Sequence, residues 1–523
     1  MSENPLKESI LNDDEFTLTW ELVPGRGARE KNQEAIFEGA EKAIEGGLID
    51  AITITENPGG NPAISAEYLG MKLKEMGIEP LVHFTCKDKS RNQIESFLYS
   101  LERENVGNIL VMTGDYPVSG YNGTSKPVYD FDPVHIVELI TDLNGGLEYK
   151  DAFGRSKSLK PTNFFPGVAV SPFKRLESEQ MAQYYKLKKK VEAGAQYIIP
   201  QLGYDARKFH ELIKFVEMQG WDIPIIGNVY LLHHGASRAM NANRIPGCVV
   251  TDDLVAELAQ EKENSDDGGH HGALMRAAKM YAFKKGMGFA GVHIAGHGMS
   301  YEDLEFIIEK GEELAPNWRD YLHEFDFPME DGFYYFEKDE ETGLNTDKPA
   351  EKTHNPSSGI VNRSFRIMHH ALFEPHSPLF GIMQGTCAAI EDSALEGPFE
   401  LMERVIKTIS NECQECGDCA LFDLAYLCPM SQCPKNQRNG ACGGSKDGWC
   451  EIYYGEQKCI YVRAYDRLKA HGEEEQLQEY IVPPVDWDLY QTSSWINFYM
   501  GRDHVAERIG VTPPGEDGEG KKA

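Results

Sequence analysis

Eight short apolar runs, each followed by a longer amphipathic segment, constrain the fold more than any other feature of this sequence. The intervening segments place apolar residues three and four positions apart and often end at glycine, which is typical of helices that pack one face on a sheet. The strand-like runs are 17–23, 50–56, 79–86, 108–115, 167–172, 196–202, 224–232 and 289–296. Eight strand and helix pairs predict an α/β fold, a (β/α)8 TIM barrel, with an open doubly wound sheet as the alternative.

The chain of 523 residues is longer than one hydrophobic core usually organises, so further domains are expected after the barrel. We place the barrel over 1–314 and an irregular connector, rich in charged and turn residues, over 315–358. A smaller cysteine-rich metal-binding domain is expected over 359–480. A C-terminal extension and flexible tail would follow over 481–523.

The composition is strongly acidic. Lys and Arg number 52 against 83 Asp and Glu, which gives a net charge of -31. Such a charge repels nucleic acid and anionic lipid, so neither is expected as a partner. The N-terminus lacks the basic start and apolar run of a secretory signal, and no apolar run reaches the roughly 18 residues that span a bilayer. The sequence therefore predicts a cytoplasmic protein with no membrane span.

Eight of the 11 cysteines fall within one short segment, and such clustering indicates a site. A reducing compartment disfavours disulfides. Three cysteines at successive spacings of three, completed by a remote cysteine before proline, form the ligand pattern of a [4Fe-4S] cluster, and both Cys428 and Cys433 precede proline. Zinc suits the wider spacings equally, so the division between iron–sulfur and zinc stays open. The predicted metal ligands are Cys413, Cys416, Cys419, Cys428, Cys433, Cys442, Cys450 and Cys459.

Polar side chains mark the ends of several predicted strands. A barrel enzyme builds its site from the C-terminal ends of its strands, so such residues are candidates for chemistry when they occur together on one rim. They are Glu21, Thr55, His83, Thr85, Asp115, Gln201 and His293.

The stretches TLTWELVPGRG, DAITITENPGG, LVHFTC, NILVMTGDYP and YKLKKKVEAGAQYIIPQLGYD resemble, in order and spacing, the barrel of the methylenetetrahydrofolate reductase family. The resemblance covers residues 15 to about 310 and is most specific between Lys186 and Asp205. It implies an oxidoreductase acting on the CH–NH group of donors. Such an enzyme interconverts 5,10-methylenetetrahydrofolate and 5-methyltetrahydrofolate by hydride transfer at a flavin, for which FAD is favoured over FMN.

The resemblance also implies roles for single residues. Glu21 matches the general acid of the family, and we expect burial beside Trp20 and Leu22 to raise its pKa toward neutrality. Asp115 and Gln201 match the pair that hydrogen-bonds the pterin, for which a carboxylate and an amide are chemically suited. The flavin contacts of the family map onto Thr55, His83, Ala169 and Lys190.

Two positions depart from the better-known members of that family. Thr113 stands where they have arginine, and Ser171 stands where they have an aromatic residue. In the family these positions touch the cofactor. The loop after 224–232 also departs from the pattern that receives a nicotinamide. These departures therefore favour a route of electrons to the flavin other than direct reduction by a nicotinamide nucleotide.

The segments CPMSQCPKNQRNGACGG and GWCEIYYGEQKC resemble the C-terminal domain found with methylenetetrahydrofolate reductases of anaerobic bacteria, over residues 360 to about 470. That domain is described as metal-binding and is associated with iron–sulfur proteins. The resemblance implies an Fe–S or zinc domain for electron input or partner docking. The donor would be a ferredoxin, an NADH-oxidising subunit or a heterodisulfide-reductase-like subunit, within a homo-oligomer or a larger complex.

Two other classes of function stay open. The first is a tetrahydrofolate-dependent methyltransferase that carries out no redox chemistry. The second is a non-catalytic electron-transfer or scaffold subunit whose barrel has lost its cofactor, for which Thr113 and Ser171 are the motivation. Flavin absorbance and reactivity toward 5-methyltetrahydrofolate separate these classes from the reductase.

Overall fold

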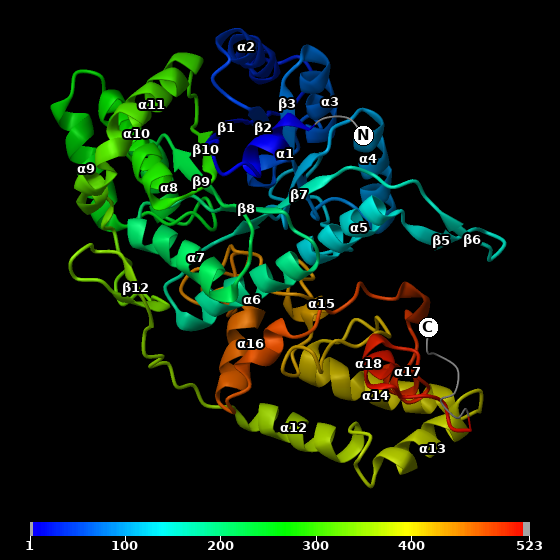
Figure 1. Cartoon of the computed structure of the whole chain (residues 1–523). Helices are drawn as coiled ribbons and strands as arrows, with labels where there is room; N and C mark the ends of the chain where they lie inside the picture. The colour runs from blue at the N-terminus through cyan, green and yellow to red at the C-terminus, as the bar shows by residue number, and fades with distance from the viewer. Residues whose placement is uncertain (1–3, 516–523) are drawn as a thin grey trace.

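A barrel of parallel strands forms the N-terminal part of the computed structural model, which describes residues 4–515 (Figure 1). Its strands are β1 (Thr17–Leu22), β2 (Ala51–Ile54), β3 (Glu79–Thr85), β4 (Asn108–Met112), β7 (Phe165–Val170), β8 (Tyr197–Pro200), β9 (Ile226–Tyr230) and β10 (Gly291–Ala295). The barrel closes between β8 and β9, where the Ile198 amide donates to the Pro224 carbonyl at 3.0 Å. The predicted barrel is thus confirmed, and the open sheet is not formed.

Helices surround the barrel because each carries one apolar face toward the strands. Several end at a glycine with positive φ, as the sequence pattern predicts. They are α2 (Lys31–Gly46), α3 (Ala66–Met76), α4 (Arg91–Arg103), α5 (Pro133–Gly145), α6 (Glu177–Glu192), α7 (Ala206–Gln219), α8 (His234–Asn241), α9 (Asp252–Asn264), α10 (His270–Met287) and α11 (Tyr301–Leu314), with the short helix η1 (Pro58–Gly60) and the hairpin β5 (Glu148–Lys150) and β6 (Ser156–Ser158) in the loops.

The two ends of the barrel interior differ in chemistry. At the N-terminal end, helix α1 (Pro5–Ile10) inserts Leu6 and Ile10 against apolar side chains from the strand starts, such as Leu81 and Phe165. This end is therefore a closed apolar core. Polar side chains gather at the opposite end, where the strands finish, which is the end at which barrel enzymes build their sites.

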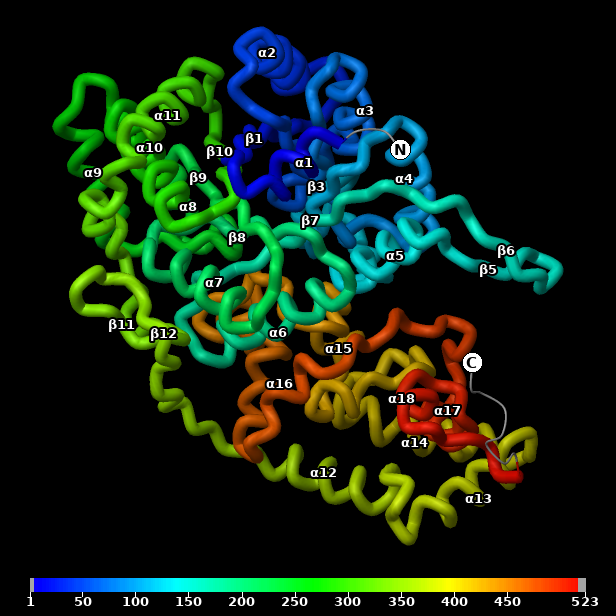
Figure 2. The backbone as a smooth tube through the Cα atoms, viewed as in Figure 1, coloured from blue at the N-terminus to red at the C-terminus, as the bar shows by residue number. Residues whose placement is uncertain are grey.

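The predicted connector folds onto the barrel as the helix η2 (Ala315–Phe325) and the hairpin β11 (Phe336–Lys338) and β12 (Asn345–Pro349). Arg207 of α7 donates to Asn345 at 2.9 Å. Further helices build a second domain, drawn in yellow to red in Figures 1 and 2. They are α12 (Ile360–Leu372), α13 (Phe380–Ile390), α14 (Glu396–Asn411), α15 (Pro429–Gln432), α16 (Ile460–Lys469), η3 (Glu474–Gln478), η4 (Trp487–Leu489), α17 (Ser494–Tyr499) and α18 (His504–Ile509).

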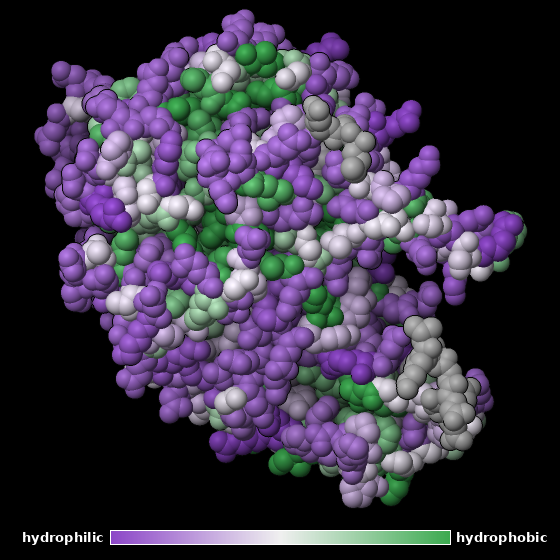
Figure 3. Space-filling view, viewed as in Figure 1, coloured by the Kyte–Doolittle hydropathy of each residue, from purple (hydrophilic) through white to green (hydrophobic). Residues whose placement is uncertain are grey.

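The second domain has its own small core, in which Phe373 and Cys387 pack against Phe498 and Tyr499. The predicted C-terminal extension therefore packs within this domain as far as Val511, while residues 516–523 of the predicted tail lie outside the described residues. Hydrophilic side chains cover most of the face in Figure 3, with scattered apolar patches. Within the described part of the chain, we find no helix with the length and apolarity needed to span a membrane.

The two domains share a broad contact at the barrel mouth. Helix α16 lies along α6, and the cysteine-containing loops between α14 and α16 lie under the same side of the barrel (Figures 1 and 2). A buried ion pair between Lys469 and Glu177 joins α16 to the start of α6. The cysteine-rich region is consequently packed against the end of the barrel that carries the candidate site.

Candidate functional site

One hydrogen-bonded set of side chains lies where β1 and β10 end. The parallel register pairs Thr19 with His293, and Glu21 follows Thr19 by two residues, so alternation along β1 directs both toward the barrel interior. His293 Nδ1 is hydrogen-bonded to Thr19 Oγ1 at 3.1 Å, and its Nε2 to Glu21 Oε2 at 3.3 Å. The His293 imidazole thus holds the carboxyl group of Glu21, and Thr19 fixes the orientation of that imidazole.

The predicted rise in the pKa of Glu21 is wrong for this structure. Burial acts to raise the pKa, but the hydrogen bond and charge of His293, together with the charge of His83, outweigh it and hold the pKa below its ordinary value. Burial lowers the pKa of His83 to about 4. Burial thus disfavours the charged form of His83, whereas the neighbouring histidines favour the charged form of Glu21.

Glu21, His83 and His293 could also form a metal site. Each offers one ligand atom, and these three atoms lie within 4.8 Å of one another, which holds for no other trio of His, Cys, Asp or Glu within residues 4–515. Two imidazoles and a carboxylate suit a divalent ion. The existing hydrogen bond from His293 to Glu21 already uses both partners, which favours an acid–base role over a metal site.

The other sequence-predicted residues surround the mouth. Asp115 is exposed after β4, where its Oδ2 accepts from the Gly59 amide at 2.8 Å. Gln201 follows β8, and its Oε1 accepts from the Leu202 amide at 2.9 Å, so its side-chain amide is free to donate elsewhere. Lys190 donates from α6 to the carbonyl of Ala169 in β7 at 2.6 Å. The structure therefore brings the predicted Ala169 and Lys190 into direct contact.

Several buried polar atoms at the mouth have no hydrogen-bond partner among the described residues. A buried hydroxyl or imidazole normally finds a partner, so these atoms indicate a ligand surface. Two of them belong to predicted flavin contacts, Thr55 and His83. The set comprises Thr53 Oγ1, Thr55 Oγ1, Thr85 Oγ1, His83 Nε2, Ser171 Oγ and Asn228 Oδ1. Donors and acceptors of this kind fit the polar edge of a flavin.

The β4 and β7 side of the mouth is lined by the second domain. Thr113 Oγ1 donates to Gln437 Oε1 at 3.2 Å, and Lys186 Nζ donates to the same oxygen at 2.7 Å. Ser171 lies under Gly443, where a Cβ on that glycine would meet the serine Cβ at 3.9 Å. Both departures from the family pattern thus occur where the cysteine-rich domain contacts the rim.

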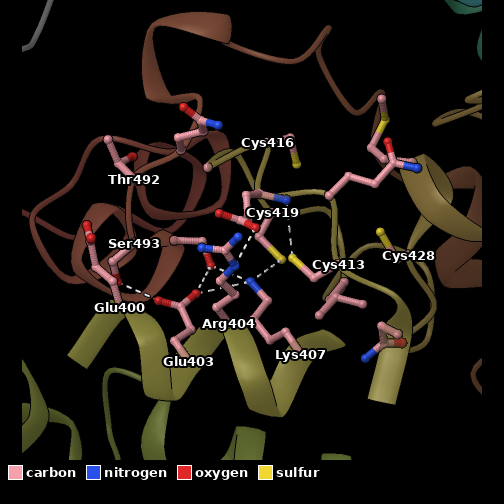
Figure 4. Close-up of a pocket in the computed structure, with 18 of the residues that line it drawn as sticks. Glu400, Glu403, Arg404, Lys407, Cys413, Cys416, Cys419, Cys428, Thr492 and Ser493 are labelled. Atoms are coloured by element: carbon pink, nitrogen blue, oxygen red, sulfur yellow. Dashed lines mark hydrogen bonds and ion pairs between the residues drawn. The ribbon is translucent and has the colours of Figure 1, made fainter. Parts of the chain in front are cut away.

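The cysteines form two separate sets. The first, here the outer thiol set, lines a cavity of about 360 Å³ between α14 and α17 (Figure 4) and consists of Cys413, Cys416, Cys419 and Cys428. Lys407 Nζ lies 3.4 Å from Cys419 Sγ and also bonds Ser494 and Glu403. Of the two cysteines that precede proline, Cys428 is therefore the one that joins the predicted run of three.

The second set surrounds a much smaller cavity of about 20 Å³ next to the barrel. This inner thiol set consists of Cys433, Cys442, Cys450 and Cys459. Sulfurs around one zinc ion lie about 3.8 Å apart, because each Zn–S bond is about 2.3 Å. All eight thiols lie within the described residues, and in neither set do three sulfurs approach within 4.8 Å of one another.

Sequence reasoning missed several groups at the mouth. Tyr230 at the end of β9 is close enough to Glu21 for that charge to help raise the tyrosine pKa to about 12, after the larger effect of burial. Lys435 donates to the Gly114 carbonyl at 2.9 Å from the second domain. The position of Tyr230 at a strand end could have identified it from the sequence. Lys435 could not be identified in this way, because it lies more than 300 residues from its partner.

Comparison with known proteins gives matches to both domains. The family profile described as Methylenetetrahydrofolate reductase matches residues 6–302, and the one described as Methylene-tetrahydrofolate reductase C terminal matches residues 393–488. Methylenetetrahydrofolate reductase 2 of Saccharomyces cerevisiae is 28% identical over 200 residues, or 37% of this chain and 30% of the yeast protein. Methylenetetrahydrofolate reductase (NADH) 1 of Arabidopsis thaliana is 25% identical over 224 residues, or 42% and 36%.

The matched segments thus span about a third of the length of these relatives. Among solved structures, an uncharacterized protein from Clostridium thermocellum that binds two copies of 5-methyl-5,6,7,8-tetrahydrofolic acid aligns with a TM-score of 0.41. Its sequence identity is 14%, and the alignment covers 60% of this chain and 99% of that chain.

Proposed function

Because the chain belongs to the methylenetetrahydrofolate reductase family, we propose that it interconverts 5,10-methylenetetrahydrofolate and 5-methyltetrahydrofolate by hydride transfer at a flavin in the barrel mouth. The observation that carries this proposal is the hydrogen-bonded set of Thr19, His293 and Glu21 at the end of the barrel. Opening the methylene bridge requires a proton at nitrogen, and a carboxyl group coupled to an imidazole can hold and deliver one.

The substrate would lie between two polar side chains. Asp115 offers a carboxylate whose second oxygen is not used by the Gly59 amide, and Gln201 offers an amide nitrogen. An aminopyrimidine edge presents donors and an acceptor together, so this pair is suited to orient a pterin. These two residues would place the bridge of the substrate toward Glu21.

The flavin, FAD in this proposal, would supply a hydride acceptor and donor when bound. Thr55 and His83 contribute buried polar atoms without partners among the described residues. The Ala169 carbonyl and Lys190 lie at β7, which β4 separates from β3. Lys190 would meet a phosphate or a polar flavin edge as a cation. All four are the flavin contacts expected from the sequence.

The outer thiol set would hold a [4Fe-4S] cluster. Its support is the sequence pattern and the cavity of about 360 Å³ that all four thiols line. The inner thiol set, around a cavity of about 20 Å³, would hold a second metal group, for which the cysteine spacing suits zinc as well as a cluster. Electrons from a donor protein such as a ferredoxin would enter through this region.

Replacing Glu21 by Gln tests the catalytic proposal. Turnover of 5-methyltetrahydrofolate with an artificial acceptor should fall by about 10²–10⁴-fold while the flavin absorbance stays, because the amide binds like the acid without giving or taking a proton. Glu41→Gln, exposed on α2, is the matched control and should turn over normally. Full activity in the Glu21→Gln variant would contradict the proposal.

The wild-type protein separates the alternatives. Purification without oxygen should give a yellow protein that contains iron and acid-labile sulfide, about four of each per cubane. A colourless protein that transfers methyl groups without oxidising 5-methyltetrahydrofolate would be the methyltransferase instead. Zinc without iron would exclude the electron-input role of the cysteine-rich domain.

A further inference from the structure

A continuous stretch of the second domain, residues 435–447, follows the rim of the barrel and is called the mouth segment here. At the β4 side, Lys435 donates to the Gly114 carbonyl at 2.9 Å, and Gln437 accepts from Thr113 at 3.2 Å. Lys186 on α6 donates to Gln437 at 2.7 Å and to the Gly440 carbonyl at 3.0 Å. These contacts lie immediately before Asp115, a predicted substrate residue.

The same segment continues along the β7 side. Lys174 donates to the carbonyls of Gly443 at 2.5 Å and Ser445 at 2.6 Å. At its far end, Lys446 donates to the Asn241 carbonyl at 2.9 Å, and Asp447 pairs with Arg175 at 2.5 Å. The mouth segment therefore contacts the rim on both sides of the predicted flavin residue Ala169.

The contacts of two buried lysines, Lys174 and Lys186, depend on the position of the segment rather than on charge pairing. Lys174 and Lys186 are buried, and the oxygens that accept from them belong to carbonyls and one amide of the mouth segment. Gly440 has φ +139°, and a Cβ there would overlap the Cβ of Lys186. Buried ammonium groups need these partners, so displacement of the segment would leave two cations at the mouth unsatisfied.

The inner thiol set brackets the mouth segment. Cys433 precedes it, Cys442 lies within it and Cys450 follows it. A chain of side chains also joins the thiols to the rim, because Cys442 Sγ lies 3.7 Å from Glu451, and Glu451 forms a buried ion pair with Lys435. A metal group bound by these thiols would hold the segment at one point within it, Cys442, and at residues that flank each of its ends.

We propose that the metal group of the inner thiol set fixes the mouth segment as one wall of the ligand site, so that metal occupancy and ligand binding in the barrel favour each other. The identity of the barrel ligand, FAD with 5-methyltetrahydrofolate, rests on the proposed function. The coupling itself rests on the contacts of residues 435–447 and is reciprocal by linkage: metal loss weakens ligand binding, and bound ligand slows metal loss.

The first test compares one cysteine from each set in the full-length protein under anaerobic conditions. Cys450→Ser should lose the inner metal, increase amide hydrogen exchange in 435–447 and weaken FAD binding at least tenfold. Cys416→Ser, in the outer set, should lose its own metal and leave both the exchange of 435–447 and the FAD affinity unchanged. Unchanged exchange and affinity in metal-depleted Cys450→Ser would overturn the proposal.

A second pair of variants leaves every thiol in place. Lys435→Met breaks the tie between Glu451 and Gly114 and should weaken FAD and 5-methyltetrahydrofolate binding at least tenfold with full metal content. Lys469→Met removes another buried ion pair between the domains, to Glu177, and should leave both affinities unchanged. Equal affinities in the two variants would overturn the proposal.

Failure of the proposed function gives a different result. A wild-type protein that binds neither FAD nor 5-methyltetrahydrofolate would contradict the reductase assignment. The exchange of residues 435–447 in metal-loaded protein and Cys450→Ser would still decide whether the inner metal holds the mouth segment.

Discussion

The two halves of the barrel mouth are built differently. On the β1 and β10 side, Thr19, Glu21 and His293 all come from barrel strands and bond to one another. On the β4 and β7 side, Thr113 and Lys186 have their partners in the mouth segment of the second domain. One half is complete within the barrel, and the other half is completed from more than 250 residues away.

This difference separates two aspects of function. The acid–base group needs only the strand register, so its chemistry should be indifferent to the state of the cysteine-rich domain. The β4 and β7 side needs the second domain in place, so its stability and its affinity for ligand should depend on metal binding by the thiols. Substitutions on the β1 and β10 side are therefore expected to change the rate of proton transfer. Substitutions on the β4 and β7 side are expected to change ligand affinity.

Metal loss is expected to have the largest effect, a decrease in the free energy of unfolding. It tests how far the β4 and β7 side of the mouth depends on the thiols. Structural metal sites contribute on the order of 10 kcal/mol to folding, so Cys459→Ser in the inner set should lower the free energy of unfolding by several kcal/mol. Cys428→Ser in the outer set should cost less, because its thiols face an open cavity of about 360 Å³. Anaerobic urea denaturation followed by circular dichroism measures both, and equal losses would erase the distinction between the sets.

The next prediction concerns the half that is complete within the barrel. His293→Gln removes the group that lowers the pKa of Glu21, so burial would raise that pKa and move the pH profile of turnover upward. Loss of the proton partner should also lower kcat about 100-fold, which is about 2.7 kcal/mol of activation free energy.

The pH profile and kcat of His293→Gln should respond equally in metal-loaded and metal-depleted protein. His323→Gln, exposed in η2, is the control and should leave both unchanged. A pH profile that stays in place in His293→Gln would show that this imidazole does not act through Glu21.

Most of the barrel could be predicted from the sequence because its signals are local. Each strand run is short and apolar, each helix repeats at three and four, and every predicted run contains one observed barrel strand or overlaps it. The site residues followed because nearly all of them lie at strand ends, where the fold fixes their direction. Glu21 was found in this way, but its pKa was not, since His293 arrives from the last strand.

The β4 and β7 half was beyond sequence reasoning for a physical reason. Thr113 and Ser171 read as departures from a family pattern, and only the packing of residues 435–447 explains what surrounds them. The ammonium groups of Lys174 and Lys186 are satisfied by backbone carbonyls and a side-chain amide of another domain. No periodicity or spacing records such contacts. The division of the eight thiols into two sets, by contrast, followed from their spacing, and only the choice between Cys428 and Cys433 needed the structure.

The smallest expected effect is the pH dependence of Lys190, which probes the β7 wall directly. Burial, followed by the charge of Lys186, lowers the pKa of Lys190 to about 7, against the opposing charges of Asp132 and Cys86. The unfolded chain keeps this proton up to about pH 10.5, so between these values the unfolded state binds more protons and the stability rises with pH. Wild-type protein should therefore gain about 1 kcal/mol of unfolding free energy per pH unit above 7 from this group.

Lys190→Met should flatten that rise, whereas Lys188→Met, which removes the ion-pair partner of Glu192, should keep it. Denaturation between pH 7 and 9 measures the slope. A bound phosphate would favour the charged lysine and shift the rise to higher pH, so the same titration repeated with FAD shows whether Lys190 meets the cofactor. An identical slope in Lys190→Met and wild type would mean that this lysine is already neutral or hydrated, and that the wall beside Ala169 is open to water.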